Sequence, residues 1–488
     1  MSGPCHFAIF GAAGHLATTK LLPALYDLEV ASRLDAALSF IALARRDWDT
    51  ARWREHLRIG LSERRGQHLE TGIVERFIER FEFVAGDHRD PATYGAFVET
   101  VNRRRAGTCE NVVFYLAVPP DEFLEIVRLL DETGLNSALG RHRIVVEKPF
   151  GSDLASACML NAELHRHYAE EQVYRIDHYL GKEAVQNLFV FRFANAIIEP
   201  LWNSHYIDHV QITVAESDGI GARAGYFDRA GTLRDIVQNH LFQVLALVAM
   251  EPPASLDADD LRNEKVKVLR SVRPFTAASV DGAALRGQYV SAEIDGVQVP
   301  GYREEPGVAQ NSATETYAAL KLHVDNWRWR GVPFYLRSGK PLKARRSQVA
   351  IRFRDAPHQL FASTPCAEVE PNWLVLGIQP EESIDLELQV REPGLDMTPR
   401  LLRIETAYRL AHERRLDAYA SLLLDVIEGD RSLFIRFDEV EAAWAIVDPI
   451  LQRWAGSTAV TSAYSAGSWG PEDSARLLEK PYQAWRNE

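Results

Sequence analysis

The stretch Phe7–Ala17 reads FAIFGAAGHLA and decides the fold of the N-terminal part of the chain. Phe7–Phe10 is a short apolar run of the kind that forms a buried strand, and a glycine-rich turn closes it. Gly11, Gly14 and Ala17 leave space for backbone amides at the N-terminus of the following helix to approach a pyrophosphate. Many turns of this kind only cap a helix, so the turn alone predicts nucleotide binding no better than a structural role.

Strand and helix signals alternate along the first third of the chain and predict a doubly wound, Rossmann-like α/β domain with a parallel sheet. From about Tyr206, apolar and polar residues alternate in runs with few helices between them, which predicts a larger α+β domain with a mainly antiparallel sheet. We expect the domains at 1–177 and 178–488, with helices such as Thr232–Met250 and Leu416–Glu428 packed on the second sheet. The first-domain strands are expected at Phe7–Phe10, Ser39–Ala44, Phe81–Ala85, Val112–Val118 and Ile144–Val146.

The composition excludes several classes of protein. The 488 residues include 55 Lys+Arg against 68 Asp+Glu, and the net charge of -13 argues against nucleic acid or an anionic membrane as the main partner. The four cysteines have no paired spacing, which indicates neither a zinc cage nor a disulfide framework. No stretch approaches the length of a membrane span. We therefore expect a cytoplasmic protein that attracts any anionic ligand with a local basic pocket.

Two charged motifs follow the predicted parallel strands. Tyr174–Glu183 reads YRIDHYLGKE and is too rich in charge to be buried without partners, so a solvated, exposed loop is the plain interpretation. Glu147–Gly151 reads EKPFG at the end of a strand. Because strand C-termini in such a sheet point at the ligand crevice, Lys148 is placed to meet a cofactor or substrate, and Pro149 is a candidate for a cis peptide bond.

The second predicted strand ends in Arg45 and Arg46. An NAD site more often has a lone carboxylate here for the ribose 2′-hydroxyl, whereas two guanidiniums favour a 2′-phosphate and hence NADP. Asp47 argues against this interpretation, and a surface arginine pair is the alternative.

His240 lies beside the apolar stripe of the helix predicted at Thr232–Met250, where a histidine is more often a core residue than a functional one. Asp235 is five positions earlier, about 140° round an α-helix, so the two residues would share a face only if Asp235 reached out from the first turn. Further along, Trp327–Arg346 is aromatic and then strongly basic, which suits either a phosphate group or a protected hairpin edge.

Together these residues resemble the glucose-6-phosphate 1-dehydrogenase family, and the similarity runs nearly the whole chain. It rests on the glycine turn and on a set of ordered segments: Glu147–Gly151, Arg175–Glu183, Tyr226–Asp228, Arg234–Asp235, Gln238–His240 and Val332–Lys340.

The resemblance implies oxidation of D-glucose 6-phosphate with NADP as the only cofactor and without a metal. It implies that His240 is the general base and Asp177 its carboxylate partner. Substrate contacts are implied for Lys148, His178, Tyr179, Lys182, Glu216, Asp235, Lys340 and Arg345, with Gln379 nearby. Cofactor contacts are implied for Gly11, Ala13, Gly14, His15, Leu16, Arg45, Arg46, Tyr115 and Lys148.

The chain departs from the family pattern at His15, where an aspartate is usual, and at Thr18-Thr19, where basic residues are usual. Ala350 and Gly377 stand where animal members carry basic residues for a second NADP, so we expect one, catalytic NADP per chain. The family typically forms homodimers or homotetramers through the second sheet. Three alternatives stay open: an enzyme for another hexose 6-phosphate or for NAD, a non-catalytic sugar-phosphate sensor, and an interaction subunit.

Overall fold

The computed structural model describes residues 6–66, 69–104, 111–134, 142–358, 360–361, 369–407, 416–456 and 461–487. The chain divides into two compact units. Unit 1 comprises Met1–Lys182, Ala254–Arg262 and Arg414–Glu441, and unit 2 comprises Glu183–Pro253, Asn263–Glu413 and Ala442–Glu488. The predicted domains, 1–177 and 178–488, stay a prediction, since these units are defined by packing alone.

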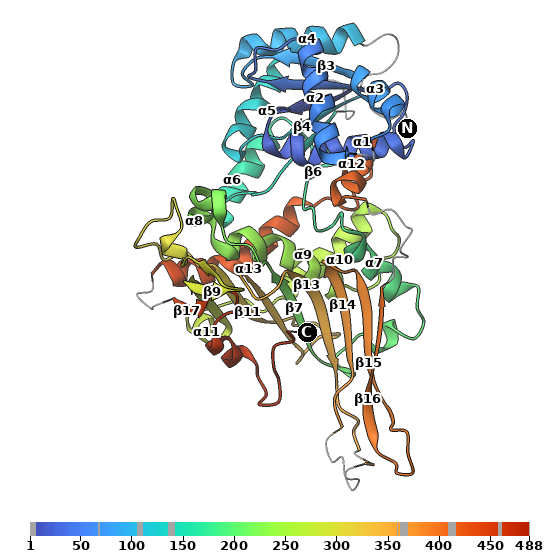
Figure 1. Cartoon of the computed structure of the whole chain (residues 1–488), viewed down its shortest axis with the longest axis vertical. Helices are drawn as coiled ribbons and strands as arrows, with labels where there is room; N and C mark the ends of the chain where they lie inside the picture. Colours follow the sequence, from blue (N-terminus) through green and yellow to red (C-terminus); the bar gives the residue numbers. More distant parts are fainter. Residues whose placement is uncertain are drawn as a thin grey trace. The chain divides into compact units, whose positions relative to one another are not determined.

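Unit 1 is built on a six-stranded parallel sheet with the order β3-β2-β1-β4-β5-β6, which confirms the predicted Rossmann-like fold. Helices cover the sheet, so β1, β2, β4 and most of β5 are buried, which explains their apolar runs, whereas β3 is partly exposed (Figure 1). The strands are β1 His6–Phe10, β2 Ser39–Ala44, β3 Phe81–Ala85, β4 Val112–Leu116, β5 Arg143–Val146 and β6 Val173–Arg175. The helices are η1 Ala17–Leu21, α1 Leu22–Val30, α2 Thr50–Arg65, α3 Thr71–Glu79, α4 Pro91–Arg104, η3 Pro120–Glu122, α5 Phe123–Glu132, α6 Leu154–Leu164, η5 Glu170–Gln172 and α12 Ala418–Glu428.

Helix α12 corrects one expectation. The predicted helix Leu416–Glu428 packs on unit 1 beside α1, not on the antiparallel sheet (Figure 1, orange-red beside blue). Its apolar residues, among them Leu422 and Leu423, join the core of the parallel sheet. An apolar stripe predicts that a helix is packed, but not which sheet it covers.

Unit 2 is built on a nine-stranded mixed sheet with the order β16-β15-β14-β13-β7-β12-β11-β8-β17. Six of its pairings are antiparallel, which confirms the predicted mainly antiparallel sheet, while β7 with β12 and β8 with β17 run parallel. The strands are β7 Ile207–Ala215, β8 Ala284–Val290, β9 Ala292–Ile294, β10 Val297–Val299, β11 Tyr317–His323, β12 Pro333–Gly339, β13 Arg346–Phe353, β14 Trp373–Gln379, β15 Ser383–Arg391, β16 Pro399–Ala407 and β17 Ser462–Ser465.

The helices of unit 2 include one unusual element, the π-helix η8, which packs against β7 and β12. The helices are α7 Glu183–Phe193, η6 Glu199–Leu201, η7 Gly221–Arg223, α8 Ala224–Thr232, η8 Leu233–Leu241, α9 Phe242–Ala249, α11 Ala277–Ala283, η9 Tyr302–Glu304 and η10 Glu472–Leu477. Two more helices, α10 Ala258–Ser271 and α13 Phe437–Ala455, continue from one unit into the other. None of the helices in the described part of the chain combines the length and apolar character needed to span a bilayer.

Candidate active site

The glycine turn after β1 has the geometry of a cofactor cradle. Gly11 has φ +81°, and a Cβ there would lie 2.5 Å from the carbonyl oxygen of Ala117. A Cβ at Gly14 would lie 3.0 Å from the carbonyl oxygen of Gly11. Ala13 and Leu16 are partly buried beside these glycines, and His15 is exposed. Gly11 and Gly14 thus let the turn pack closely against Ala117 and against itself. The turn lies between the first strand and the first helix, where a pyrophosphate binds in folds of this class.

The arginine pair lies next to this turn. The amides of Gly11 and Ala12 both donate to the carbonyl of Leu43, at 3.0 and 3.1 Å, so the turn is tied to the end of β2. Arg45 and Arg46 follow directly and are exposed, with the Arg46 guanidinium 5.9 Å from the Trp48 ring centre. Neither arginine forms an ion pair with another described residue, and their charges are therefore available to an anion near the turn.

Lys148 and Asp177 follow the neighbouring strands β5 and β6, at the carboxyl ends of the parallel strands. The amide of Ile176 donates to the carbonyl of Val146 at 3.0 Å, so β5 and β6 end in register. Lys148 is half-buried, and the Lys148–Pro149 peptide bond is cis, as predicted. In a doubly wound sheet this edge is where ligands bind.

The residues of the Tyr174–Glu183 motif are buried or half-buried, so the predicted exposure is wrong, although residues 176–182 do form a loop between β6 and α7. Asp177 is 1% exposed and Arg175 2% exposed. Burial is tolerated because the charges have partners: Arg175 pairs with Glu170 at 2.7 Å, and an Asp177 oxygen accepts from the amide of Tyr179 at 2.9 Å. The charged residues of the motif are therefore parts of a buried, hydrogen-bonded polar site.

Three residues of this motif form an aromatic and cationic group. The Lys182 ammonium lies 3.8 Å from the Tyr179 ring centre, within cation–π range. The His178 ring is parallel to the ring of Tyr419, with 6.4 Å between the centres. Gly181 allows α12 to approach, because a Cβ there would lie 2.4 Å from the carbonyl of Ala418. Unit 1 thus holds an imidazole and an ammonium suited to a phosphate group.

Glu147 is the centre of a polar cluster that the sequence did not reveal. The Tyr115 hydroxyl donates to Glu147 Oε1 at 2.5 Å, and the Tyr419 hydroxyl is a second donor. Burial raises the pKa of Glu147 to about 7, although both tyrosines and Lys148 act to lower it. Tyr115 itself is fully buried, and its hydroxyl is hydrogen-bonded to the Glu147 carboxyl.

We expect Glu147→Gln to change the pH dependence of stability. Since the pKa of Glu147 is about 7 in the folded chain and about 4.5 when unfolded, the folded state binds more protons between these values. Stability contributed by this group is thus complete below pH 4.5 and is lost as the pH rises through 7, by up to about 3 kcal/mol. Glutamine cannot titrate.

Urea unfolding of both proteins at pH 5 and pH 8, followed by a probe of unit 1, measures this difference. The variant should gain stability relative to the parent on going from pH 5 to pH 8. Parallel pH profiles for the two proteins would show that Glu147 does not titrate in this range.

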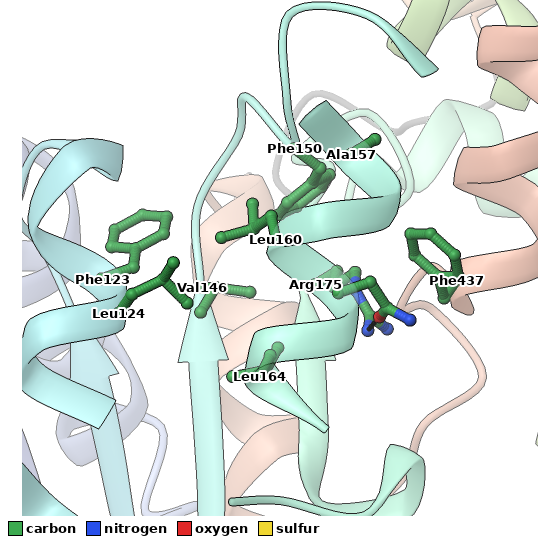
Figure 2. Close-up of a pocket in the computed structure, with 10 residues that line it drawn as sticks. Phe123, Leu124, Val146, Phe150, Ala157, Leu160, Leu164, Arg175 and Phe437 are labelled. Carbon is green, nitrogen blue, oxygen red and sulfur yellow. Dashed lines mark hydrogen bonds between the residues drawn. The ribbon is translucent and has the colours of Figure 1, made fainter. Parts of the chain in front are cut away.

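Unit 1 also has a pocket lined by Val146, at the end of β5, whose chemistry differs from that of the Glu147 cluster. Figure 2 shows Phe150 and Leu160 on one side and Phe123 and Leu124 on the other, with the Arg175 head group near Phe437. Its lining is mostly apolar, and the guanidinium of Arg175 is already paired with Glu170. Among the described residues that line it, the pocket therefore has no free cation for a sugar phosphate, and we assign it no substrate.

Unit 2 brings Glu216 and Lys340 together at the ends of two parallel strands. β7 and β12 pair in register at Ala215 and Gly339, and the amide of Glu216 donates to the carbonyl of Gly339 at 3.1 Å. The Lys340 ammonium forms an ion pair with Glu216. Parallel pairing explains this proximity, because residues that follow two such strands emerge at the same edge.

Asp235 and His240 are both carried by η8 and are both buried. Asp235 lies 3.3 Å from the Tyr226 hydroxyl and 3.4 Å from an Arg223 nitrogen. The expected separation of about 140° is wrong, because η8 is a π-helix, whose hydrogen bonds join residues five apart. Five residues make little more than one turn of such a helix, so Asp235 and His240 lie nearer to the same face than they would in an α-helix.

Arg345, from the basic stretch, and Gln379 also lie at strand ends of the same sheet. Arg345 is exposed just before β13, and Gln379 is half-buried at the end of β14.

The catalytic pair predicted from the resemblance divides between the units, with Asp177 in unit 1 and His240 in unit 2. Their roles stay predictions.

Comparison with known proteins shows which family the chain belongs to. Residues 8–187 match the model of the glucose-6-phosphate dehydrogenase NAD-binding domain, and residues 189–486 match the model of the C-terminal domain of the same family. The chain belongs to the glucose-6-phosphate dehydrogenase family. Its membership supports a nicotinamide cofactor in unit 1, where the glycine cradle fits one.

Relatives match over their full length. The glucose-6-phosphate 1-dehydrogenase of Mycolicibacterium smegmatis is 45% identical over 99% of this chain and 97% of its own, and that of Bacillus subtilis is 40% identical over 98% and 97%. The crystal structure of the Mycobacterium avium glucose-6-phosphate 1-dehydrogenase has a TM-score of 0.86 at 36% identity, covering 100% of this chain and 99% of that one. A glucose-6-phosphate dehydrogenase solved with its substrate glucose 6-phosphate has a TM-score of 0.89 at 33% identity, covering 98% of both chains.

Proposed function

We propose that this chain oxidises D-glucose 6-phosphate with NADP⁺ to 6-phospho-D-glucono-1,5-lactone and NADPH, the first step of the oxidative pentose phosphate pathway. The observation that carries the proposal is the family match along the whole chain, together with a relative solved with glucose 6-phosphate. When bound, the nicotinamide accepts a hydride from C1.

His240 is proposed as the general base. A hemiacetal hydroxyl is a weak acid in water, so a neutral imidazole takes the C1 hydroxyl proton as the C1–H bond breaks. Asp177 is proposed to orient the imidazole and to stabilise its charged form. Both side chains are nearly fully buried, and burial strengthens electrostatic interactions.

The sugar phosphate is proposed to bind through its two ends. Lys182, His178 and Tyr179 hold the phosphate, which converts binding energy far from C1 into orientation at C1. Glu216 and Asp235 accept hydrogen bonds from sugar hydroxyls. Lys148 contacts both substrate and cofactor, and Lys340 and Arg345 complete the basic side of the site.

NADP is proposed in preference to NAD because of Arg45 and Arg46. Both are exposed beside the glycine turn, without carboxylate partners among the described residues. Cofactor contacts are proposed for Gly11, Ala13, Gly14, His15 and Leu16, while Tyr115 acts through Glu147. A cytoplasmic location and a homodimer or homotetramer remain predictions.

Initial rates test the function. Purified protein with glucose 6-phosphate and NADP⁺ should increase the absorbance of NADPH, with a higher kcat/KM than for other hexose 6-phosphates. A higher kcat/KM for a different hexose 6-phosphate would favour that substrate. Binding of both ligands with no NADPH formed would favour a sensor.

Lys182→Gln should raise the KM for glucose 6-phosphate by about 10- to 150-fold, because a charge-assisted hydrogen bond contributes roughly 1.5–3 kcal/mol. The rate with unphosphorylated glucose should not change, since glucose has no phosphate for Lys182 to bind. Lys267→Gln is the matched control, because Lys267 is exposed and pairs only with Glu264 among the described residues. Equal losses with both sugars would place Lys182 outside the phosphate site.

A further inference from the structure

The π-helix η8 is unusual in its length as well as its position. It runs for nine residues, Leu233–Leu241, whereas most π-helical segments are single turns within α-helices and occur often at functional sites. Its wide turns also contain Asp235 and His240, which the proposed function uses. The α-helical register is ordinarily more stable, so contacts from side chains must hold this segment in the π-register.

The side chain of Asn239 occupies the last wide turn. Its carboxamide oxygen accepts from the backbone amide of His240 at 2.7 Å, and its amide nitrogen donates to the carbonyl of Arg234 at 2.9 Å. In an α-helix, the His240 amide would donate to the carbonyl of Ile236 instead. In a π-helix this amide would donate to the carbonyl of Asp235, so Asn239 replaces a backbone bond of His240 in either register. The bond from Asn239 to Arg234 spans five residues, which is the spacing of the π-register, and it therefore favours that register over the α-helical one.

The first turn of η8 is fixed by a second residue, Glu315. Its carboxylate accepts from the amide of Leu233 at 3.0 Å, and its backbone carbonyl accepts from the amide of Thr232 at 3.1 Å. Gly231, at φ +66°, makes room for it, since a Cβ there would lie 2.3 Å from Glu315 Oε1. Both ends of η8 are thus held by side chains outside the helical hydrogen-bond pattern.

The register decides which residues face one another. Five residues span about 500° in an α-helix, which would leave Asp235 and His240 about 140° apart. In the π-register the same five residues make about one turn, so the buried carboxylate and imidazole lie on one face. A change of register would move one of them away from the substrate.

We infer that Asn239 is a positioning residue that, with Glu315, holds η8 in the π-register and thereby aligns the base His240 with the hydroxyl acceptor Asp235. Asn239 acts through the backbone of His240 and does not need to touch the substrate. The inference rests on the proposed function for the roles of His240 and Asp235, but the register itself is a property of the fold.

Asn239→Ala tests the inference. A misplaced base costs up to about 100-fold in rate, so kcat should fall by about 10- to 100-fold, while the KM for NADP⁺ stays within about twofold. Asn239→Asp keeps the acceptor for the His240 amide but loses the donor to Arg234, and should recover part of kcat. Asn195→Ala is the matched control, because the Asn195 side chain also donates to a helix carbonyl, that of Phe191 at 3.0 Å, on the surface of unit 2.

The rates of the parent protein and of Asn239→Ala show whether the inference or the proposed function has failed. If the parent protein turns over and Asn239→Ala keeps its kcat within about twofold, the inference is wrong. If the parent protein does not turn over, the proposed function fails, and a crystal structure of Asn239→Ala still tests the register. The inference expects the His240 amide to donate to Ile236 in that structure. An unchanged π-helix would overturn it.

Discussion

His240→Asn should lower kcat by about 10⁴-fold while the Kd for glucose 6-phosphate changes little, because asparagine keeps a polar side chain but cannot accept the C1 proton. The loss should appear in kcat and kcat/KM alike, as expected when an interaction made in the transition state is removed. Stopped-flow or steady-state NADPH absorbance measures the rate, and isothermal titration measures the binding.

The matched control is His205→Asn, at an exposed histidine of unit 2. It should keep kcat within about twofold, since surface substitutions rarely perturb a structure. Turnover near the parental rate in His240→Asn would assign the base to another residue. A large loss of binding together with the loss of rate would instead indicate that His240 is a core residue on which the site depends structurally.

The second large effect is expected for the double variant Arg45→Ala/Arg46→Ala. Two charge-assisted bonds to a 2′-phosphate contribute roughly 3–6 kcal/mol if both form, so kcat/KM for NADP⁺ should fall by at least about 10²-fold. The value for NAD⁺ should change by no more than about threefold, since NAD lacks that phosphate. The measurement is kcat/KM for the two cofactors at one ionic strength.

Arg64→Ala provides the control, because Arg64 is an exposed arginine at the end of α2 in the same unit. It should leave the preference for NADP⁺ unchanged. Equal losses for NADP⁺ and NAD⁺ in the double variant would show that the pair attracts the cofactor without recognising the 2′-phosphate.

Local patterns predicted the elements of the fold well. Most strands of unit 1 are buried on both faces and are apolar runs that stand out from the helices around them. Strand β6 was not predicted, because two of its three residues lie at the start of the charged motif. The place of α12 was not predictable in this way, because its contacts are with α1, almost 400 positions earlier in the chain. An amphipathic stripe contains no information about a partner so distant in sequence.

Single residues of the candidate site could be named from the sequence, but the contacts between them could not. Periodicity assumes 3.6 residues per turn, which placed Asp235 and His240 apart, and only the π-register of η8 brings them together. The Glu216–Lys340 pair depends on the parallel pairing of β7 with β12 inside a mainly antiparallel sheet. Pairings between distant segments follow from tertiary packing, to which a single sequence gives no direct access.

The most direct test of the account uses glucose 6-phosphate that carries deuterium at C1. With NADP⁺ and the parent protein, mass spectrometry of the reduced cofactor should find one deuterium per molecule of NADPH, because the hydride leaves C1 and the hydroxyl proton goes to the protein. NADPH without deuterium, or deuterium retained in the sugar product, would contradict oxidation at C1.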